Sequence, residues 1–88
     1  MNSEILWSNI KRYQGDVFHT VRGKPYKYVA HNDSYLTVEN VKGSKIKKEY
    51  IERAMQIRDP SPQKISLIGC WGPSYIYGLI TDKRIITH

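Results

Sequence analysis

The stretch YKYVAHNDSYLTVEN (26–40) alternates apolar and polar side chains on both sides of a short polar interruption. A period of two residues is typical of half-buried β-strands. The stretch therefore predicts strands over 26–30 and 35–40, joined by the turn HNDS. Leu36 and Val38 should lie on one face of the second strand, opposite to Tyr35 and Thr37. A connection this short requires the two strands to be antiparallel.

The period of two continues upstream of this hairpin. VFHTV (17–21) is predicted as a preceding strand, and RGKP as the turn that follows it. The three strands would form an antiparallel meander. Before them, Leu6 and Ile10 recur at helical spacing, and Ser3 stands where an N-cap is expected. We expect an N-terminal helix that ends before Gly15.

Two helices are predicted downstream of the meander. VKGSK is interpreted as a turn, and 48–57 as an amphipathic helix that the prolines of DPSP (59–62) bring to an end. Gly72-Pro73 begins the next helix, because proline is favoured at the first helical position. Short extended pieces are expected over 65–68 and 84–86. The chain is thus predicted to be a single α+β domain over 1–88: an N-terminal helix, a three-stranded antiparallel meander and two C-terminal helices.

Composition bounds the size of the protein and the compartment in which it works. Eighty-eight residues are enough for one domain with a thin core. Cys70 is the only cysteine, so an internal disulfide is impossible. The N-terminal stretch lacks the pattern of a signal peptide, and no apolar run approaches the roughly 20 residues that span a bilayer. We therefore expect a cytoplasmic protein.

Positive charge is concentrated in the middle of the chain. The net charge is +6, and residues 22–48 carry seven Lys and Arg against two acidic residues, a net of +5. These seven cations are Arg22, Lys24, Lys27, Lys42, Lys45, Lys47 and Lys48. In the predicted meander, the first turn and the connection to the following helix lie at the same end of the sheet. The cations could then form one basic patch suited to the phosphates of nucleic acid, which is the partner we expect.

A protein contact is the alternative function. Large aromatic rings anchor protein interfaces, and Trp71 and Tyr77 lie at the rim of the apolar stripe of the last helix. They would be the contact residues of a protein-interaction or homodimerisation module. Trp7, Trp71 or the exposed sheet face would be the dimer contacts, and a dimer would relieve a thin core.

Residue patterns for catalysis, metal binding and cofactor binding are missing from the sequence. Cys70 lies between apolar residues without a charged neighbour, and Ser74 has the position of a first-turn hydroxyl and is outside any G-x-S-x-G motif. His19 and His31 are expected to be solvent-facing residues of strands, because no spaced histidine motif accompanies them. We predict a non-enzymatic protein with no metal, no cofactor and no small-molecule substrate.

Three separated segments follow the order of motifs in a known family: FHTVRGKPYKY (18–28), IKKEYIERAM (46–55) and GPSYIYGLITDKRI (72–85). In these segments the chain resembles a small bacterial domain of unknown function, with the pattern F-T-x-x-G-K-P-F-x-Y, then I…F-E-K-A, then G-P-S-Y-x-x-A-I-L-x-D-P-R-I. The matching positions are Gly23, Lys24, Pro25, Tyr28, Ala54, Gly72, Pro73, Ser74, Tyr75, Asp82, Arg84 and Ile85. Gly78 and Lys83 depart from it, standing where the pattern has alanine and proline. The resemblance implies a protein of bacterial genomes rich in mobile genetic elements and defence genes, and it implies no activity.

Overall fold

The computed structural model describes residues 3–86 of the chain. Its elements in chain order are α1 (Ser3–Arg12), β1 (Phe18–His19), β2 (Pro25–Tyr26), β3 (Tyr28–His31), β4 (Tyr35–Val38), β5 (Lys45–Lys47), α2 (Lys48–Met55), α3 (Pro62–Ser66) and α4 (Pro73–Ile80). Helices and antiparallel strands are combined in one small body, so the predicted α+β class is confirmed.

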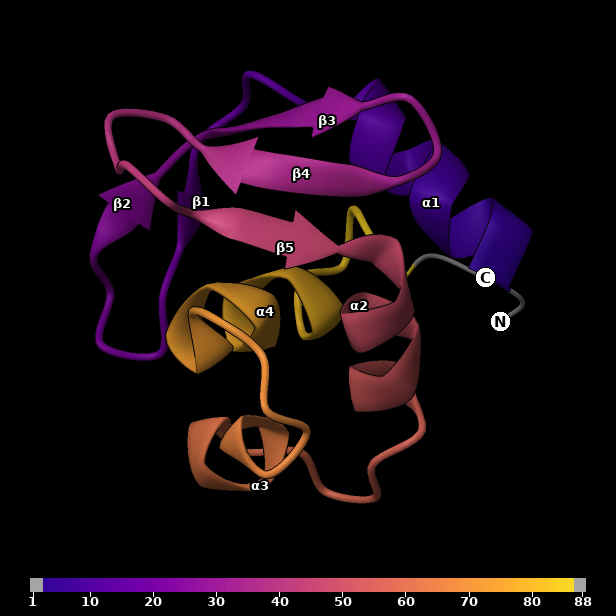
Figure 1. The fold of residues 1–88 in the computed structure, drawn as a ribbon, viewed down its shortest axis with the longest axis vertical. Helices are drawn as coiled ribbons and strands as arrows, with labels where there is room; N and C mark the ends of the chain where they lie inside the picture. Colours follow the sequence, from indigo (N-terminus) through magenta and orange to yellow (C-terminus); the bar gives the residue numbers. More distant parts are fainter. Residues whose placement is uncertain (1–2, 87–88) are drawn as a thin grey trace.

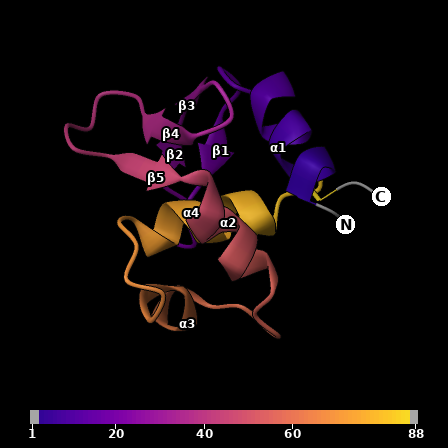
Figure 2. The ribbon, with the colours of Figure 1, turned by 45° about the vertical axis from the view of Figure 1, so that its right-hand side comes forward.

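The main sheet and the helices form successive layers. Figures 1 and 2 show the sheet of β3, β4 and β5 at the top, α4 and α2 beneath it, and α3 at the bottom. α1 lies beside the β3 edge of this sheet, where the Tyr28 hydroxyl donates a hydrogen bond of 2.6 Å to the Ile10 carbonyl. None of the helices within residues 3–86 combines the length and the apolar character needed to cross a bilayer.

The predicted meander is present, but it is built from a different set of strands. β1 and β2 pair only with each other, as a separate two-stranded sheet, and the main sheet has the order β3-β4-β5. The strand expected over 17–21 is reduced to Phe18–His19, and the one expected over 26–30 is split at Lys27. The hairpin over 28–38 agrees with the prediction, with Ala30 paired to Leu36.

The third strand of the main sheet was not predicted: the expected turn covered 41–45, and no element was assigned to 46–47. β5 pairs antiparallel with β4, with Leu36 opposite Ile46. Ser44, which is buried, brings the chain back to β4: its hydroxyl accepts from the Val38 N–H and donates to the Val38 carbonyl, at 2.9 and 3.0 Å. Only Ile46 in β5 points to the core, so the strand has too little apolar signal to be recognised by periodicity.

Three other local predictions also need correction. The segment expected to be extended over 65–68 contains the end of α3, because the Ser61 hydroxyl accepts from the Lys64 N–H and Pro62 opens the helix. α2 ends at Met55, two residues before the predicted end. The tail over 84–86 is a turn in which the N–H groups of Ile85 and Ile86 both donate to the Asp82 carbonyl.

α4 crosses β1 at very short range, and this approach depends on Gly78. A Cβ atom at Gly78 would lie 2.2 Å from the carbonyl oxygen of His19 and 3.1 Å from the Tyr26 hydroxyl. Here the backbones of a helix and a strand leave no room for a methyl group, so the glycine allows the core to close.

We predict that Gly78→Ala destabilises the protein although alanine is the better helix former. The gain in helix propensity is up to about 1 kcal/mol, whereas forcing a methyl group against a backbone carbonyl costs about 1–3 kcal/mol or more. Urea unfolding followed by circular dichroism measures the net loss. Gly69→Ala is the control, because at a φ of +85° with open space around it only the left-handed strain of about 1–2 kcal/mol applies. A Gly78→Ala variant more stable than the wild type would contradict the close approach.

Candidate nucleic-acid interface

The seven cations expected to bind phosphate are accessible and unpaired. Six of their side chains are exposed, and Lys48 is half-buried. Within residues 3–86 none of the seven is in an ion pair; the pairs that are present use Lys11, Arg53 and Arg84. None of the seven cationic groups is therefore bound to a carboxylate within the described residues, although the Lys48 charge contributes to the lowered pKa of the nearby Asp33 carboxyl.

Two lysines share one face of the main sheet with two rings. We call this the outer sheet face. The register places Val29 opposite Thr37 and Thr37 opposite Lys45, and in the next row His31 opposite Tyr35 and Tyr35 opposite Lys47. The outer sheet face consists of these residues: Val29, His31, Tyr35, Thr37, Lys45 and Lys47. The alternate side chains of the same strands, Tyr28, Leu36, Val38 and Ile46, are buried in the core.

Tyr35 is the centre of the outer sheet face. His31 stacks on its ring with centroids 4.7 Å apart and an angle of 20° between the planes. The Lys45 ammonium lies 4.5 Å from the centre of the ring, and it comes from the strand on the other side of β4. The His31 ring is itself held by a hydrogen bond of 2.9 Å between Nε2 and the Thr37 hydroxyl. The two rings are thus fixed in an ordered stack, with lysines on both rows.

The basic connections are distributed differently from the prediction. The turn with Arg22 and Lys24 belongs to the small sheet, whereas Lys42 lies in the loop from β4 to β5. The Glu39 N–H donates to the Lys27 carbonyl at 2.9 Å, which brings this loop to the beginning of β3. By the register, Lys27 and Glu39 continue the outer sheet face by one further row.

Lys48 stands apart from the other six cations. It begins α2, where its ammonium lies 5.9 Å from the centre of the Trp7 ring. It also lines a hollow that contains the exposed Lys11–Asp33 ion pair, and the Lys11 ammonium lowers the pKa of the Asp33 carboxyl. Lys48 therefore lies in a mixed-charge region, and we do not place it in the interface.

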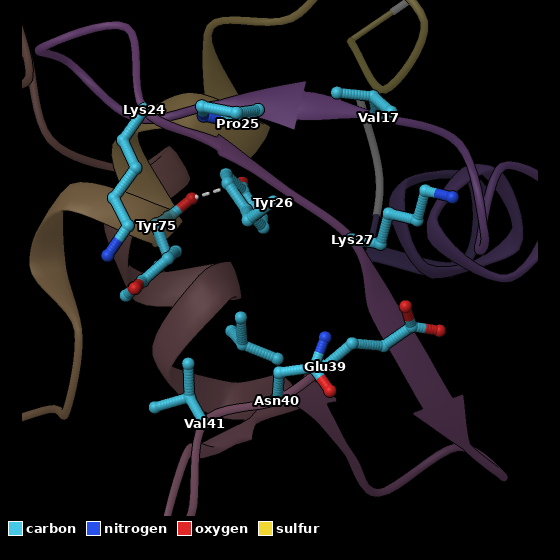
Figure 3. A pocket seen from close by; sticks show the side chains of 10 residues that line it. Val17, Lys24, Pro25, Tyr26, Lys27, Glu39, Asn40, Val41 and Tyr75 are labelled. Atoms are coloured by element: carbon cyan, nitrogen blue, oxygen red, sulfur yellow. Dashed lines mark hydrogen bonds between the residues drawn. The ribbon is translucent and has the colours of Figure 1, made fainter.

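A hollow of about 450 Å³ opens between β2, the β4–β5 loop and α4 (Figure 3). We call it the Tyr75 pocket. It is lined by Val17, Lys24, Pro25, Tyr26, Lys27, Val38, Glu39, Asn40, Val41 and Tyr75. The pocket joins the two connections that carry Lys24 and Lys42, although Arg22 and Lys42 themselves do not line it. Like the outer sheet face, it combines lysines with an aromatic ring.

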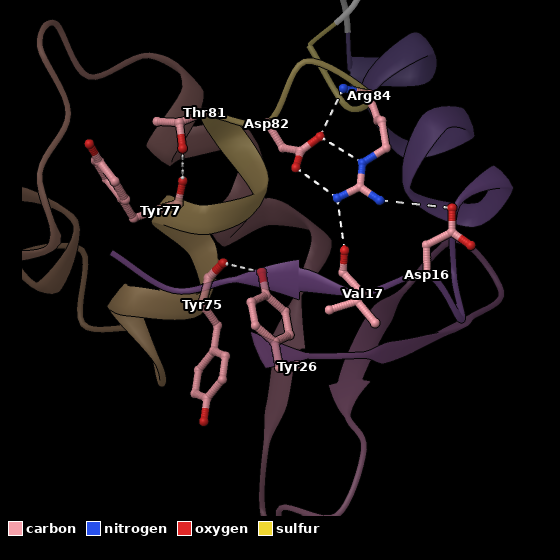
Figure 4. A network of polar contacts seen from close by, with 8 residues as sticks. All are labelled: Asp16, Val17, Tyr26, Tyr75, Tyr77, Thr81, Asp82 and Arg84. Atoms are coloured by element: carbon pink, nitrogen blue, oxygen red, sulfur yellow. Dashed lines mark hydrogen bonds and ion pairs between the residues drawn. The ribbon is translucent and has the colours of Figure 1, made fainter. Parts of the chain in front are cut away.

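The two predicted protein-contact residues lie apart. Trp71 stacks on Tyr75 at 5.3 Å, with the ring planes 6° from parallel, and is 37% exposed. Tyr77 is half-buried and leaves α4 in a different direction from Tyr75 (Figure 4). Trp7 is only 2% exposed and donates its indole N–H to the Asn32 carbonyl, so it is a core residue and is not available as a dimer contact.

Sequence reasoning did not select Tyr35, His31 and Asn40. Periodicity assigned Tyr35 to the solvent side of its strand, but it did not reveal that His31 and Lys45 would lie against the same ring. That arrangement depends on the register of three strands, and β5 was not recognised. The ring stack could have been indicated by pairing the residues on the two sides of the HNDS turn, which places His31 opposite Tyr35.

Two side chains with reactive groups, Cys70 and Tyr26, are held in structural contacts within residues 3–86. Within 3–86 no group of three or more His, Cys, Asp or Glu is arranged to hold a metal ion. Cys70 is half-buried and donates from its thiol to the Ile65 carbonyl at 3.6 Å, and burial raises the pKa of this thiol. Burial also raises the pKa of the Tyr26 phenol, whose hydroxyl donates to the Tyr75 carbonyl at 2.8 Å. These groups are occupied in structural contacts.

Asp82 and Arg84 form a polar lock next to the core (Figure 4). The Arg84 guanidinium donates to both carboxylate oxygens of Asp82 at 3.0 and 2.9 Å and to the Val17 carbonyl at 2.9 Å. It also lies 3.8 Å from the centre of the Phe18 ring, and Asp16 is 3.9 Å away. Hydrogen bonding to Arg84 lowers the pKa of the Asp82 carboxyl. The lock ties the end of α4 to the beginning of β1, so Arg84 is not a free cation.

We predict that Asp82→Asn lowers the free energy of unfolding at neutral pH by about 1 kcal/mol, because it removes a charge-assisted contact. Since the folded pKa of Asp82 is below its unfolded value of about 4, this stabilisation is present above pH 4. It disappears as the pH falls through the folded pKa. Denaturation midpoints at several pH values measure the difference. Asp59→Asn is the charge-matched control, and a gap between Asp82→Asn and wild type that is constant with pH would contradict the assignment.

Comparison with protein-family models, curated proteins and solved structures finds no match to this chain. Its function is therefore inferred from the outer sheet face and the Tyr75 pocket.

Proposed function

We propose that this protein is a cytoplasmic, non-enzymatic binding domain that contacts nucleic acid through the outer sheet face. One observation supports this more than any other: the face carries Lys45 and Lys47 beside the His31–Tyr35 stack, and no acidic residue is on those two rows. Phosphates need accessible cations, and bases need flat apolar surfaces. The outer sheet face offers both within two rows of a sheet.

The lysines are suited to phosphate because none of them is held in an ion pair within the described residues. A lysine presents a compact charge on a flexible stem, and it binds phosphate as a point charge without fixed geometry. Lys27 adds a cation in the third row, on the β3 side of the sheet, two strands away from Lys45 and Lys47 and opposite Glu39. The first and third rows are four residues apart, which corresponds to about 13 Å along the strands. Several consecutive phosphates could be contacted over this length.

The rings of the outer sheet face would add an interaction that does not depend on charge. Every base has a π face, and stacking on an aromatic side chain contributes about 1–3 kcal/mol per base. The His31–Tyr35 stack is already ordered by the Thr37 hydrogen bond, but the Lys45 ammonium, 4.5 Å from the centre of the Tyr35 ring, must move aside before a base can stack there. We therefore expect binding that is tolerant of base sequence.

We predict that the double variant Lys45→Gln/Lys47→Gln weakens binding of a labelled oligonucleotide about tenfold at low salt. Fluorescence anisotropy measured between about 50 and 200 mM salt should also show a smaller slope of log affinity against log salt, by about 0.7–0.9 for each lysine that contacts a phosphate.

The matched control is Arg53→Gln/Arg58→Gln. It also removes two positive charges from the net charge of +6. These two residues, however, belong to the end of α2 and the turn after it, below the sheet. If charge alone attracted the nucleic acid, the two double variants would lose affinity equally. Equal loss, or no binding by the wild type at low salt, would overturn the proposed interface.

A protein contact is the second candidate, because two apolar side chains are exposed close to each other in sequence. Leu67, at the end of α3, is 86% exposed, and Trp71 is 37% exposed. Exposed apolar residues of this size are typical of contact surfaces when they adjoin. Self-association through them is the form of this function that can be tested on the protein alone.

If the second function holds, the wild type forms dimers at high concentration and Leu67→Asp shifts it to the monomer, because a buried apolar contact would be replaced by a charge. Sedimentation velocity over a range of concentrations measures this. Lys45→Gln/Lys47→Gln should leave the sedimentation unchanged. A wild type that remains monomeric at the highest concentration would exclude the dimer.

A further inference from the structure

We infer that the Tyr75 pocket receives one unstacked nucleotide of a single strand whose neighbouring phosphates lie along the outer sheet face. The inference rests on the proposed function and adds to it a second site and the form of the nucleic acid. It predicts that single-stranded nucleic acid is preferred over a duplex.

The size and the lining of the pocket suit a planar base. Its volume of about 450 Å³ lies within the range of small-molecule sites. Tyr26 and Val38, both buried, and the half-buried Val41 form an apolar floor. One wall is the Tyr75 ring, which is held edge-on against Tyr26 at 4.9 Å. An apolar floor with an aromatic wall can accommodate a flat ring such as a nucleobase.

The Tyr75 ring is a rigid surface because it is supported from two directions. Trp71 stacks on it at 5.3 Å, while Tyr26 meets it at an angle of 86°. The Tyr26 hydroxyl also donates to the Tyr75 carbonyl, which fixes the backbone of α4 at this point. A ring that is already ordered can stack with a base at a small cost in side-chain entropy.

The polar groups of the pocket are free to bind a ligand. Neither the ammonium groups of Lys24 and Lys27 nor the amide of Asn40 bonds to any side chain or backbone group within residues 3–86. Figure 3 shows the Lys24 and Asn40 side chains beside the hollow, whereas the Lys27 side chain extends away from Tyr26 and Tyr75. The lysines would contact phosphate, and an asparagine amide can pair with the edge of a base. Glu39 is the one carboxylate of the lining, and it can accept from an exocyclic amino group.

The pocket is continuous with the outer sheet face. Lys27 lines the pocket and also belongs to the row that extends the outer sheet face beyond Val29 and Thr37. A strand of nucleic acid that follows Lys47, Lys45 and Lys27 therefore arrives at the opening of the pocket. Its next base can enter while its phosphates remain on the lysines.

A paired base cannot enter the pocket without leaving its duplex. Unstacking and unpairing one base costs a few kcal/mol, and the cost is smallest for a strand that is already single. For this reason the pocket would act as a filter for single strands, whereas the lysines of the sheet would attract either form.

Fluorescence anisotropy with a labelled single strand of about 12 nucleotides and with the duplex of the same sequence tests the inference. We expect the single strand to bind at least about tenfold more tightly. Tyr75→Leu should weaken single-strand binding about tenfold and leave duplex binding unchanged, because it removes the stacking surface.

Tyr77→Leu is the matched control, since it makes the same substitution in the same helix on a side chain directed away from Tyr75. Asn40→Gly is a second pocket variant; the φ of +66° at this position is allowed for glycine, so the amide is removed without strain. It should weaken single-strand binding several-fold. Thermal melts of each variant ensure that the loss is measured on folded protein.

Binding of a mononucleotide tests the pocket separately from the outer sheet face. Adenosine 5′-monophosphate should change the fluorescence of Trp71, which stacks on the pocket wall, and Trp71→Phe should remove this signal, because the remaining Trp7 is buried. Inorganic phosphate and adenosine, each at the same concentration, should produce a smaller change.

The possible failures are distinct. If single strand and duplex bind equally and Tyr75→Leu behaves as Tyr77→Leu does, while Lys45→Gln/Lys47→Gln weakens both, the outer sheet face stands and the pocket inference is overturned. If no oligonucleotide binds at any salt concentration, the proposed function fails and the inference fails with it. A duplex preferred over the single strand also overturns the inference.

Discussion

The direct contact between the backbones of α4 and β1 at Gly78 is the constraint on which the rest of the fold depends. Because the helix lies against the His19 carbonyl without an intervening side chain, Ile76, Leu79 and Ile80 reach the middle of the core. The same approach lets the Tyr26 hydroxyl reach the α4 backbone at Tyr75. If a side chain separated the helix from the strand, the core of this 88-residue protein would be thin.

This core has a consequence for the surface. All helices that bury side chains of the main sheet do so from one side, so the other side of β3, β4 and β5 remains free. A sheet with one solvated face is common among antiparallel sheets, but its residues are not neutral here. Lys45 and Lys47 are exposed on β5, and the neighbouring Tyr35 ring is ordered by its cross-strand partners. The architecture therefore presents the candidate site as a by-product of how the core is closed.

Periodicity was a good guide where apolar residues recur and a poor one where an element has a single apolar residue. The hairpin of β3 and β4 and the start of α4 at Pro73 could be predicted, because alternation and the Gly-Pro pair are local signals. β5 and α3 could not, because each contributes one buried residue, Ile46 and Ile65, and is held by Ser44 or Ser61 hydrogen bonds. The Ser44 contact depends on the strand to which the chain returns. The Ser61 cap is local, and α3 was missed because one buried residue in a five-residue helix leaves no periodicity.

The same contrast between local signals and the folded arrangement applies to the candidate site. The basic residues were identified from charge alone, since charge excess is visible in one dimension. Their arrangement in space could not be identified in this way. The turn with Lys24 and the loop after β4 border the same hollow, and their approach to each other depends on where α4 places Tyr75.

The contact between Lys45 and Tyr35 couples the binding of a phosphate to the stacking of a base. An ammonium covers the ring from the β5 side at 4.5 Å, while His31 occupies the ring from the β3 side. No base can lie flat on Tyr35 until this ammonium swings away, and a phosphate is the group able to draw it off. The arrival of backbone charge would uncover the aromatic surface, so anions lacking a base, such as polyphosphate or heparin, would open the platform without filling it.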